Sequence, residues 1–247
     1  VASSLRMLRC TSCPHPTASA TVQTESVLAG MVEVTGGTLN IDYTSRWTDV
    51  DVAVAAGSSL LWTGGTHTIV GTLSGNPEGT LAFSSNVVQA AEGGGTLDIG
   101  GTGFEWQNSY LDGATPLVNT GLLRMTTANS RSLRGKLTNR GTLRWEDGHV
   151  YLYDDQVLRN EGTFEVALAS SRTLNRYSGD GPWRFENAGT LVSRSTPATS
   201  QVSASLINTG VVDVQVGWLQ LLYDNRWEAA GRVAVAEGAI LHLASGT

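Results

Sequence analysis

One short phrase recurs five times in this chain and constrains its fold more than any other feature. Each copy contains an apolar residue, any residue, Asn, any residue, Gly, a Thr or aliphatic residue, and a second apolar residue. The glycines of successive copies are separated by 20, 21, 27 and 21 residues. A repeat of about twenty residues is the signature of a solenoid, in which each unit stacks on the one before it. The copies lie at 117–123, 137–143, 158–164, 185–191 and 206–212.

The residues that follow each repeated glycine alternate between polar and apolar side chains, for example at 141–145 and 210–214. A period of two residues predicts a strand with one buried face. Two or three short strands and their turns fill a unit of about twenty residues, so no long helix fits between the copies. We therefore predict an all-β chain, a right-handed parallel β-helix of about ten coils with roughly 21 residues per coil.

The repeated asparagine has a structural role in such a coil. Identical residues of successive coils lie above one another, and a side-chain amide can both donate to the next amide and satisfy backbone groups in the turn. A ligand site built from the asparagines is the alternative, but a residue that occurs once per coil is typical of architecture. We predict an internal ladder of Asn119, Asn139, Asn160, Asn187 and Asn208.

The position three residues after the ladder glycine is predicted to face outward. Arg144 occupies it in one coil and Glu165 in the next. We expect these two side chains to lie side by side as an exposed ion pair. Trp145 follows Arg144 and is expected to point inward, because successive side chains of a strand face opposite sides.

Charge and composition exclude several classes of function. The formal net charge is -6, so the chain lacks the basic surface that drives binding to nucleic-acid phosphates. No apolar run reaches the roughly eighteen residues of a membrane span. We therefore expect no nucleic-acid partner and no membrane insertion, and no motif predicts a cofactor or a metal.

The first part of the chain departs from the coil pattern. Residues 1–29 are rich in Ser, Thr and Ala and are expected to form an irregular coil or a cap. They contain Cys10 and Cys13, the only cysteines. A local disulfide or a pair of inert thiols is one interpretation, a bond to material outside this chain is the second, and metal or redox chemistry is the third. No second ligand pair at zinc spacing accompanies them.

A longer repeat lies above the coil repeat. Residues 30–47 and 210–227 are offset by 180 and are identical at eight of eighteen positions. We therefore predict that 30–247 form one β-helix, which contains a module of about 180 residues plus the start of a second copy. The final residues, 239–247, align with 58–66 in mid-coil. We expect the working form to continue along the coil axis through further modules or stacked copies.

Two stretches interrupt the regular spacing. Residues 100–116 carry Phe104, Trp106 and Tyr110 and are expected to bulge outward as a loop. Residues around 177–183 account for the step of 27 and are expected to form a second insertion. Insertions in a solenoid collect where function is added.

These phrases resemble a known class of proteins. WTGG at 62–65, LTNRGTL at 137–143 and LINTG at 206–210 are similar to the tandem β-helical repeats of large bacterial surface and secreted proteins, of the adhesin and autotransporter-passenger type. The resemblance covers residues 30–247. It implies an extracellular or cell-surface protein that serves as a structural or adhesive shaft, with no catalytic motif.

Polysaccharide lyases and hydrolases also use right-handed β-helices, so a catalytic site is an alternative. Such a site needs carboxylates from adjacent coils on one face. The densest acidic stretch is 146–155, where Asp147 has no second carboxylate at the corresponding place in the neighbouring coils. Asp154 is expected beside Arg134 and Asn175, as part of a surface ion pair. We therefore predict that the chain is not an enzyme.

The same stretch contains the best candidate for binding. His149, Tyr151 and Tyr153 alternate with Val150 and Leu152 and so share one face of a strand. If the aliphatic residues point inward, the rings point outward, where they suit the flat apolar faces of sugars. Paired rings also simply cover their neighbours, so surface packing is the alternative. A carbohydrate-binding or polysaccharide-degrading β-helix, with surface glycans as partners, is the second interpretation of the whole chain.

Overall fold

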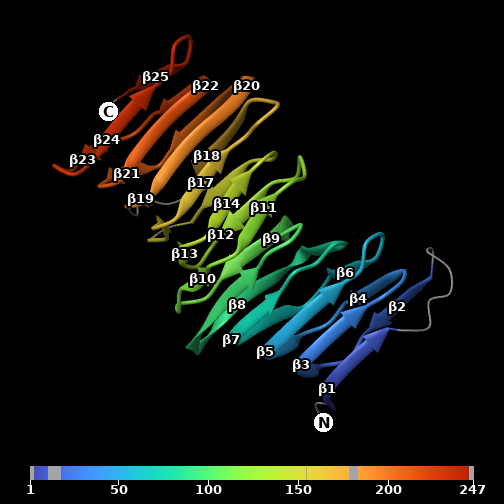
Figure 1. Ribbon diagram of the computed structural model, residues 1–247. Helices are drawn as coiled ribbons and strands as arrows, with labels where there is room; N and C mark the ends of the chain where they lie inside the picture. Colours follow the sequence, from blue (N-terminus) through green and yellow to red (C-terminus); the bar gives the residue numbers. More distant parts are fainter. Residues whose placement is uncertain (1–2, 11–17, 154, 178–182, 245–247) are drawn as a thin grey trace. The chain divides into compact units, whose positions relative to one another are not determined.

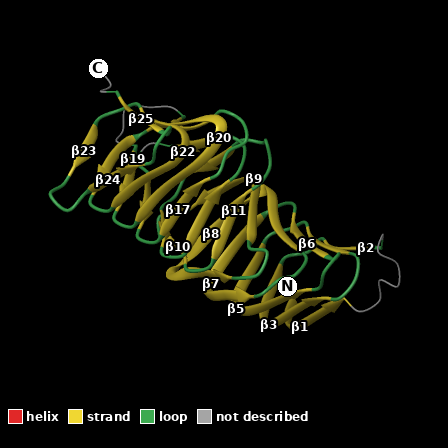
Figure 2. Cartoon of the chain, turned by 45° about the horizontal axis from the view of Figure 1, so that its top comes forward, coloured by secondary structure: helices red, strands yellow, loops and turns green. Residues whose placement is uncertain are grey.

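The computed structural model describes residues 3–10, 18–153, 155–177 and 183–244 of the chain. Within these ranges the secondary structure consists of strands joined by turns, without a helix (Figure 2). The chain divides into two compact units, Val1–Leu123 and Arg124–Thr247. Both units are parallel β-solenoids, which confirms the predicted fold class, and together they contain about ten coils of about 21 residues. The right-handed sense of the coil stays a prediction.

The first unit alternates long and short strands. The long strands β3, β5 and β7 pair with one another in parallel, and the short strands β4 and β6 do the same (Figure 1). β11 (Leu122–Met125) contains the division between the units. The strands that precede it are β1 (Ser3–Cys10), β2 (Ser19–Val22), β3 (Ser26–Val34), β4 (Thr38–Ile41), β5 (Ser45–Val54), β6 (Ser59–Trp62), β7 (Thr66–Gly75), β8 (Thr80–Ile99), β9 (Phe104–Asp112) and β10 (Leu117–Asn119).

A bend within each long strand forms one corner of the coil. A register shift marks this bend in the pairing of β3 with β5 and of β5 with β7. Gly30, Asp49 and Gly71 lie there with φ angles of 80°, 47° and 67°. This left-handed conformation is unstrained for Gly and tolerated by Asp. Oδ1 of Asp49 also accepts a hydrogen bond of 3.0 Å from the backbone N–H of Thr72, so this corner is joined to the next one.

Parallel pairing extends into the segment 1–29. β1 pairs with β3, and β2 pairs with β4. Cys10 is the last residue of β1, whereas Cys13 lies outside the described residues, and with it the expected disulfide. The module of 180 residues stays a prediction.

The stretch 100–116 does not bulge outward, which corrects the expectation from the sequence. It contains β9, which pairs in parallel with β8. Phe104 and Trp106 are 0% and 1% exposed, and Phe83 packs against both, with ring centroids 4.8 and 6.2 Å away. Phe104 and Trp106 are two residues apart, so both rings lie on the inner face of the strand and fill the core.

Coils of the second unit consist of three short strands, or of one short and one long strand, and strands at the same place in successive coils pair in parallel. One column contains β13, β16, β19, β21 and β23. The other two share the long strands β20 and β22. The strands are β12 (Arg131–Leu133), β13 (Leu137–Asn139), β14 (Thr142–Trp145), β15 (Val150–Leu152), β16 (Val157–Asn160), β17 (Thr163–Val166), β18 (Arg172–Arg176), β19 (Arg184–Asn187), β20 (Thr190–Ser203), β21 (Ser205–Asn208), β22 (Val211–Leu221), β23 (Asn225–Trp227), β24 (Arg232–Val235) and β25 (Ile240–Leu243).

The asparagine ladder runs through the interior of the second unit. Asn139, Asn160, Asn187 and Asn208 lie in register, and each is at most 1% exposed. Nδ2 of each of the first three donates to Oδ1 of the next at 2.7 Å. The same nitrogens donate to backbone carbonyl groups at 2.8 to 3.0 Å. The ladder is therefore confirmed here, and it satisfies backbone groups that water does not reach.

Asn119 belongs to the first unit, in which the preceding coils have leucine at the ladder position. It is 1% exposed and lies opposite Leu97, which in turn lies opposite Leu73. Both leucines are 0% exposed. The two coils that precede Asn119 therefore fill this interior position with leucine in place of an amide.

The glycine of the repeated phrase is required by the close approach of successive turns. A Cβ atom at Gly162 would overlap the carbonyl oxygen of Gly141, and Gly189 and Gly210 meet the preceding turn in the same way. Any side chain here would push the coils apart and lengthen the ladder hydrogen bonds.

The inward and outward assignments around Trp145 are confirmed. Trp145 is 0% exposed, and its Nε1 donates to the carbonyl oxygen of Gly148 at 2.7 Å. Arg144 lies directly opposite Glu165, with Nε and Oε2 3.6 Å apart.

We predict that Asn160→Leu lowers the free energy of unfolding by about 1 to 3 kcal/mol, because it removes one rung and leaves buried polar groups unpaired. Chemical denaturation would measure the change. Asn129→Leu, in an exposed turn, is the matched control and should leave stability nearly unchanged. Equal losses in the two variants would contradict a special role for the ladder.

We predict that Arg144→Ala changes the free energy of unfolding by less than about 1 kcal/mol, because an exposed ion pair is screened by water and salt. Phe164→Ala, on the same pair of strands but 0% exposed, should cost about 3 to 5 kcal/mol. A large loss for Arg144→Ala in the same denaturation experiment would reject the outward placement.

Candidate functional site

The candidate glycan-binding residues occupy the outer side of β15. Val150 and Leu152 are 2% and 0% exposed, whereas His149, Tyr151 and Tyr153 are half-buried. The ring centroids of His149 and Tyr151 are 6.4 Å apart. The alternation along this strand therefore places the three rings on the surface of the second unit.

Tyr177, just beyond β18, adds a fourth ring that the sequence analysis missed. Its ring stacks on Tyr153 with centroids 4.5 Å apart and planes 19° apart, and it meets Tyr151 edge to face at 5.7 Å. Tyr177 is 57% exposed. The pairing of β18 with β15 brings it here. Tyr177 lies 15 residues after Gly162, whereas Tyr153 lies 12 after Gly141, so spacing from the ladder glycine could not align the two.

Tyr153 has a neighbour in the coil on either side. The Cζ atom of Arg134 lies 4.7 Å from the centroid of the Tyr153 ring, and Nη2 donates to the hydroxyl oxygen at 3.2 Å. The register places Arg134 in the preceding coil and Tyr177 in the following one. A sugar could therefore stack on Tyr177 more readily than on Tyr153. Asp154, the expected ion-pair partner of Arg134, lies outside the described residues.

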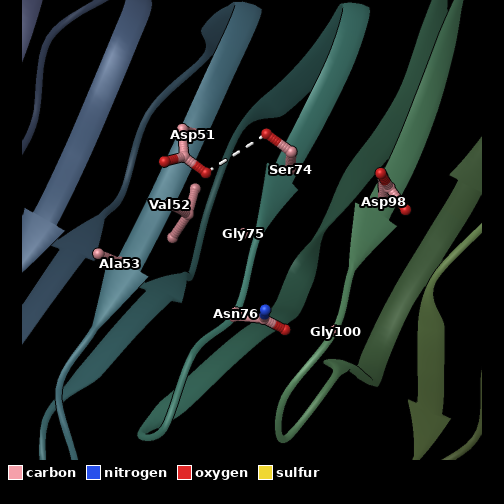
Figure 3. Close-up of a pocket in the computed structure, with 8 residues that line it drawn as sticks. All are labelled: Asp51, Val52, Ala53, Ser74, Gly75, Asn76, Asp98 and Gly100. Atoms are coloured by element: carbon pink, nitrogen blue, oxygen red, sulfur yellow. Dashed lines mark hydrogen bonds between the residues drawn. The ribbon is translucent and has the colours of Figure 1, made fainter.

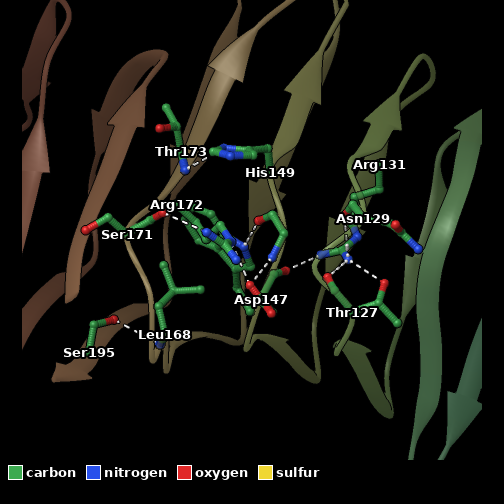
Figure 4. Close-up of polar contacts among 12 residues, drawn as sticks. Thr127, Asn129, Arg131, Asp147, His149, Leu168, Ser171, Arg172, Thr173 and Ser195 are labelled. Carbon is green, nitrogen blue, oxygen red and sulfur yellow. Dashed lines mark hydrogen bonds and ion pairs between the residues drawn. The ribbon is translucent and has the colours of Figure 1, made fainter. Parts of the chain in front are cut away.

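Asp147 forms an ion pair beside this face (Figure 4). Its Oδ1 accepts hydrogen bonds from Nε of Arg172 at 2.6 Å and from the backbone N–H of Gly148 at 2.7 Å. Burial alone would raise the pKa of the Asp147 carboxyl, but the Gly148 N–H, Arg172 and Arg131 together hold it below its usual value. A carboxylate held ionised in this way is a poor general acid.

Arg131 is a buried cation whose charge acts on Asp147, and the sequence analysis did not identify it. It is 1% exposed, and its guanidinium donates to the carbonyl oxygens of Asp147, Thr127 and Asn129 at 2.6, 2.8 and 3.1 Å (Figure 4). Burial lowers its pKa to about 10, against the opposing effect of Asp147, so it stays charged at neutral pH. Arg131 therefore ties three turn carbonyls together as a structural cation.

The first unit contains a buried serine and histidine in contact. Ser45 Oγ and His67 Nδ1 are 2.7 Å apart, and Nε1 of Trp47 donates to Ser45 Oγ at 2.7 Å. Ser45 is 1% and His67 0% exposed, and the imidazole stacks on Trp62 at 4.6 Å. Nucleophilic catalysis requires substrate to reach the hydroxyl, and this core position offers no such access.

An open groove of about 590 Å³ lies on the outer side of the first unit (Figure 3). It crosses β5, β7 and β8, and its polar lining includes Asp51, Ser74, Asn76 and Asp98. Ser74 donates to Asp51 at 3.4 Å, and Thr120 donates to Asp98 at 3.1 Å. From the sequence these residues look like any solvated strand face, so the groove was not predicted.

Comparison with known proteins leaves the resemblance to adhesin-type repeats as an inference from the sequence phrases. No protein-family model, no curated protein and no solved structure matches this chain. Within the described ranges, no cluster of three or more His, Cys, Asp or Glu side chains is arranged to hold a metal ion. The described residues also contain no helix long and apolar enough to cross a membrane.

We predict that stability falls as pH is lowered through the range in which His67 titrates. Burial lowers the pKa of His67 from 6.5 to about 4, against the opposing effect of the Gly64 backbone. Between these values the unfolded chain binds a proton that the folded chain refuses, so unfolding becomes easier as pH falls. The expected loss between pH 7 and pH 5 is about 2 kcal/mol.

Denaturation at a series of pH values would measure this loss. Asp147 and Glu161 also have lowered pKa values, Glu161 chiefly through its hydrogen bond from Arg140, and their contributions are lost at lower pH. His149→Gln should keep the loss between pH 7 and pH 5, and His67→Gln should remove it. An unchanged pH profile in His67→Gln would show that another group is responsible.

Proposed function

We propose that this chain is a segment of an extracellular structural and adhesive shaft in a repetitive bacterial surface or secreted protein. The observation that carries the proposal is the repetition of the same interior contacts in coil after coil of the second unit. Asn139, Asn160 and Asn187 each donate to the next asparagine at the same distance, 2.7 Å. In a solenoid each unit is stabilised by its neighbours, so such repetition favours a long, uniform body.

The outer surface supports the same proposal. Charged residues are paired across coils, as in Arg140 with Glu161 at 2.8 Å and Arg194 with Glu165 at 2.8 Å. The resemblance to adhesin-type repeats points in the same direction. We further propose that additional modules or stacked copies continue the coil axis.

Surface location is the test of this proposal. Antibodies raised against the chain should label intact cells of the producing organism, and protease added outside the cells should remove the label. Labelling that appears only after the cells are permeabilised would contradict the proposal. A cytoplasmic protein in the same cells, probed in parallel, controls for leakage.

We also propose that the chain is not an enzyme. The buried Ser45 and His67 lack access, and Asp147 is held ionised by Arg172. Incubation with a panel of polysaccharides should release no reducing sugar and no unsaturated product above a heat-denatured control. Release that disappears in Asp51→Asn or Asp98→Asn would instead assign catalysis to the groove of Figure 3.

A further inference from the structure

Arg176, the last residue of β18, is an exposed cation held by two aromatic rings. Its Cζ atom lies 4.9 Å from the ring centroid of Trp183 and 5.3 Å from that of Tyr223. Contact of a guanidinium with aromatic rings restricts its motion and leaves N–H groups at its edge to donate hydrogen bonds. Arg176 is thus positioned for an anion before any ligand arrives.

Among the described residues, Arg176 differs from most arginines of the second unit because no acidic side chain pairs with it. Across residues 3–10, 18–153, 155–177 and 183–244, no carboxylate forms an ion pair with it. Arginines of this unit with a carboxylate partner include Arg124, Arg140, Arg144, Arg159, Arg172, Arg194 and Arg226. The chain has a net charge of -6, so most of its cations can find an acidic neighbour. The guanidinium of Arg176 remains available to donate hydrogen bonds to an anion from outside the chain.

Tyr177 follows Arg176 directly and adds an apolar platform. Its ring stacks on Tyr153, and the guanidinium of Arg134 lies over the ring of Tyr153. These contacts restrict the motion of the Tyr177 ring, and 57% of the residue remains exposed. A fixed, exposed ring suits the flat C–H face of a pyranose.

We propose that this surface, consisting of Arg176, Tyr177, Tyr151 and Tyr223, binds an acidic polysaccharide whose sugars carry carboxylates. A carboxylate of the polymer accepts hydrogen bonds from Arg176, and a neighbouring sugar ring stacks on Tyr177. An acidic peptide would use the cation but has no flat saturated ring for the tyrosine. A neutral glycan would use the ring and leave the guanidinium unpaired. The site goes beyond the structural role, because a shaft without a ligand here would still be a shaft.

Titration calorimetry of the 247-residue chain with oligogalacturonate tests this proposal. The neutral probe is maltohexaose, and the charged probe without sugar rings is polyglutamate of similar length. Oligogalacturonate should bind at least about tenfold more tightly than either probe. Its affinity should fall as salt is raised, because the contact with Arg176 is ionic.

Substitutions locate the site. Arg176→Gln should weaken oligogalacturonate binding by about tenfold or more, and Tyr177→Ala by roughly fivefold. Arg140→Gln, which removes a surface arginine that is already paired with Glu161, is the matched control and should bind like the parent chain. Arg176→Lys keeps the charge without the planar fork, so binding should be intermediate, and it replaces Arg176→Gln if that variant does not fold.

Three results would overturn the proposal: no binding of oligogalacturonate, equal binding of polyglutamate, or undiminished binding after substitution of Arg176. None of them bears on the surface location of the protein, which the antibody experiment tests separately.

Discussion

In-register stacking of successive coils is the constraint on which the other features of the second unit depend. Parallel backbone pairing places each residue directly against its counterpart one coil away, so every side chain must be compatible with that neighbour. An asparagine can stack on another asparagine, because its side-chain amide both donates and accepts a hydrogen bond. Phe164 and Phe185 lie opposite Leu191 and Leu158 and also contact each other edge to face at 5.4 Å, so rings and leucines together fill the other interior columns.

At two outward positions of this unit, successive coils place opposite charges against each other. Arg144 lies opposite Glu165, and Arg159 lies opposite Glu186. Like charges in register would repel, whereas alternating signs remove the repulsion at little gain in stability. The same geometry thus places an amide ladder inside and, at these two positions, opposite charges outside.

The sequence predicted well the features that repeat. The strand period, the ladder of Asn139 to Asn208 and the pairing of Arg144 with Glu165 all follow from the fixed offset between copies. Contacts that occur once were not predictable in this way. Nothing in the sequence indicates that Arg131 is buried. Carbonyl groups from two turns, those of Thr127 and Asn129 in one and that of Asp147 in the next coil, surround its guanidinium. Phe104 and Trp106 were assigned to a loop because their stretch lacks the repeated phrase, although their own period of two places them inside.

The two units bury different polar side chains in their interiors. The first unit replaces the ladder amide by Leu73 and Leu97 and instead buries Ser45 with His67, in contact with Trp47 and Trp62. A neutral imidazole is tolerated there, but an imidazolium would lose its hydration without gaining an anion. The stability of the first unit is therefore tied to pH through His67, whereas the amide ladder of the second unit carries no titrating group.

Interior positions of a filled solenoid cannot bind a ligand, so any recognition must use the outer surface. Residues of that surface that depart from the coil pattern are the best candidates for a binding role. At the end of β18, Tyr177 stacks on Tyr153, and Trp183 and Tyr223 contact Arg176. Elsewhere on this unit an outward arginine typically finds a glutamate or aspartate, as Arg194 finds Glu165. Arg176 contacts two aromatic rings, and no described carboxylate pairs with it. The requirements of the fold therefore do not explain this part of the surface.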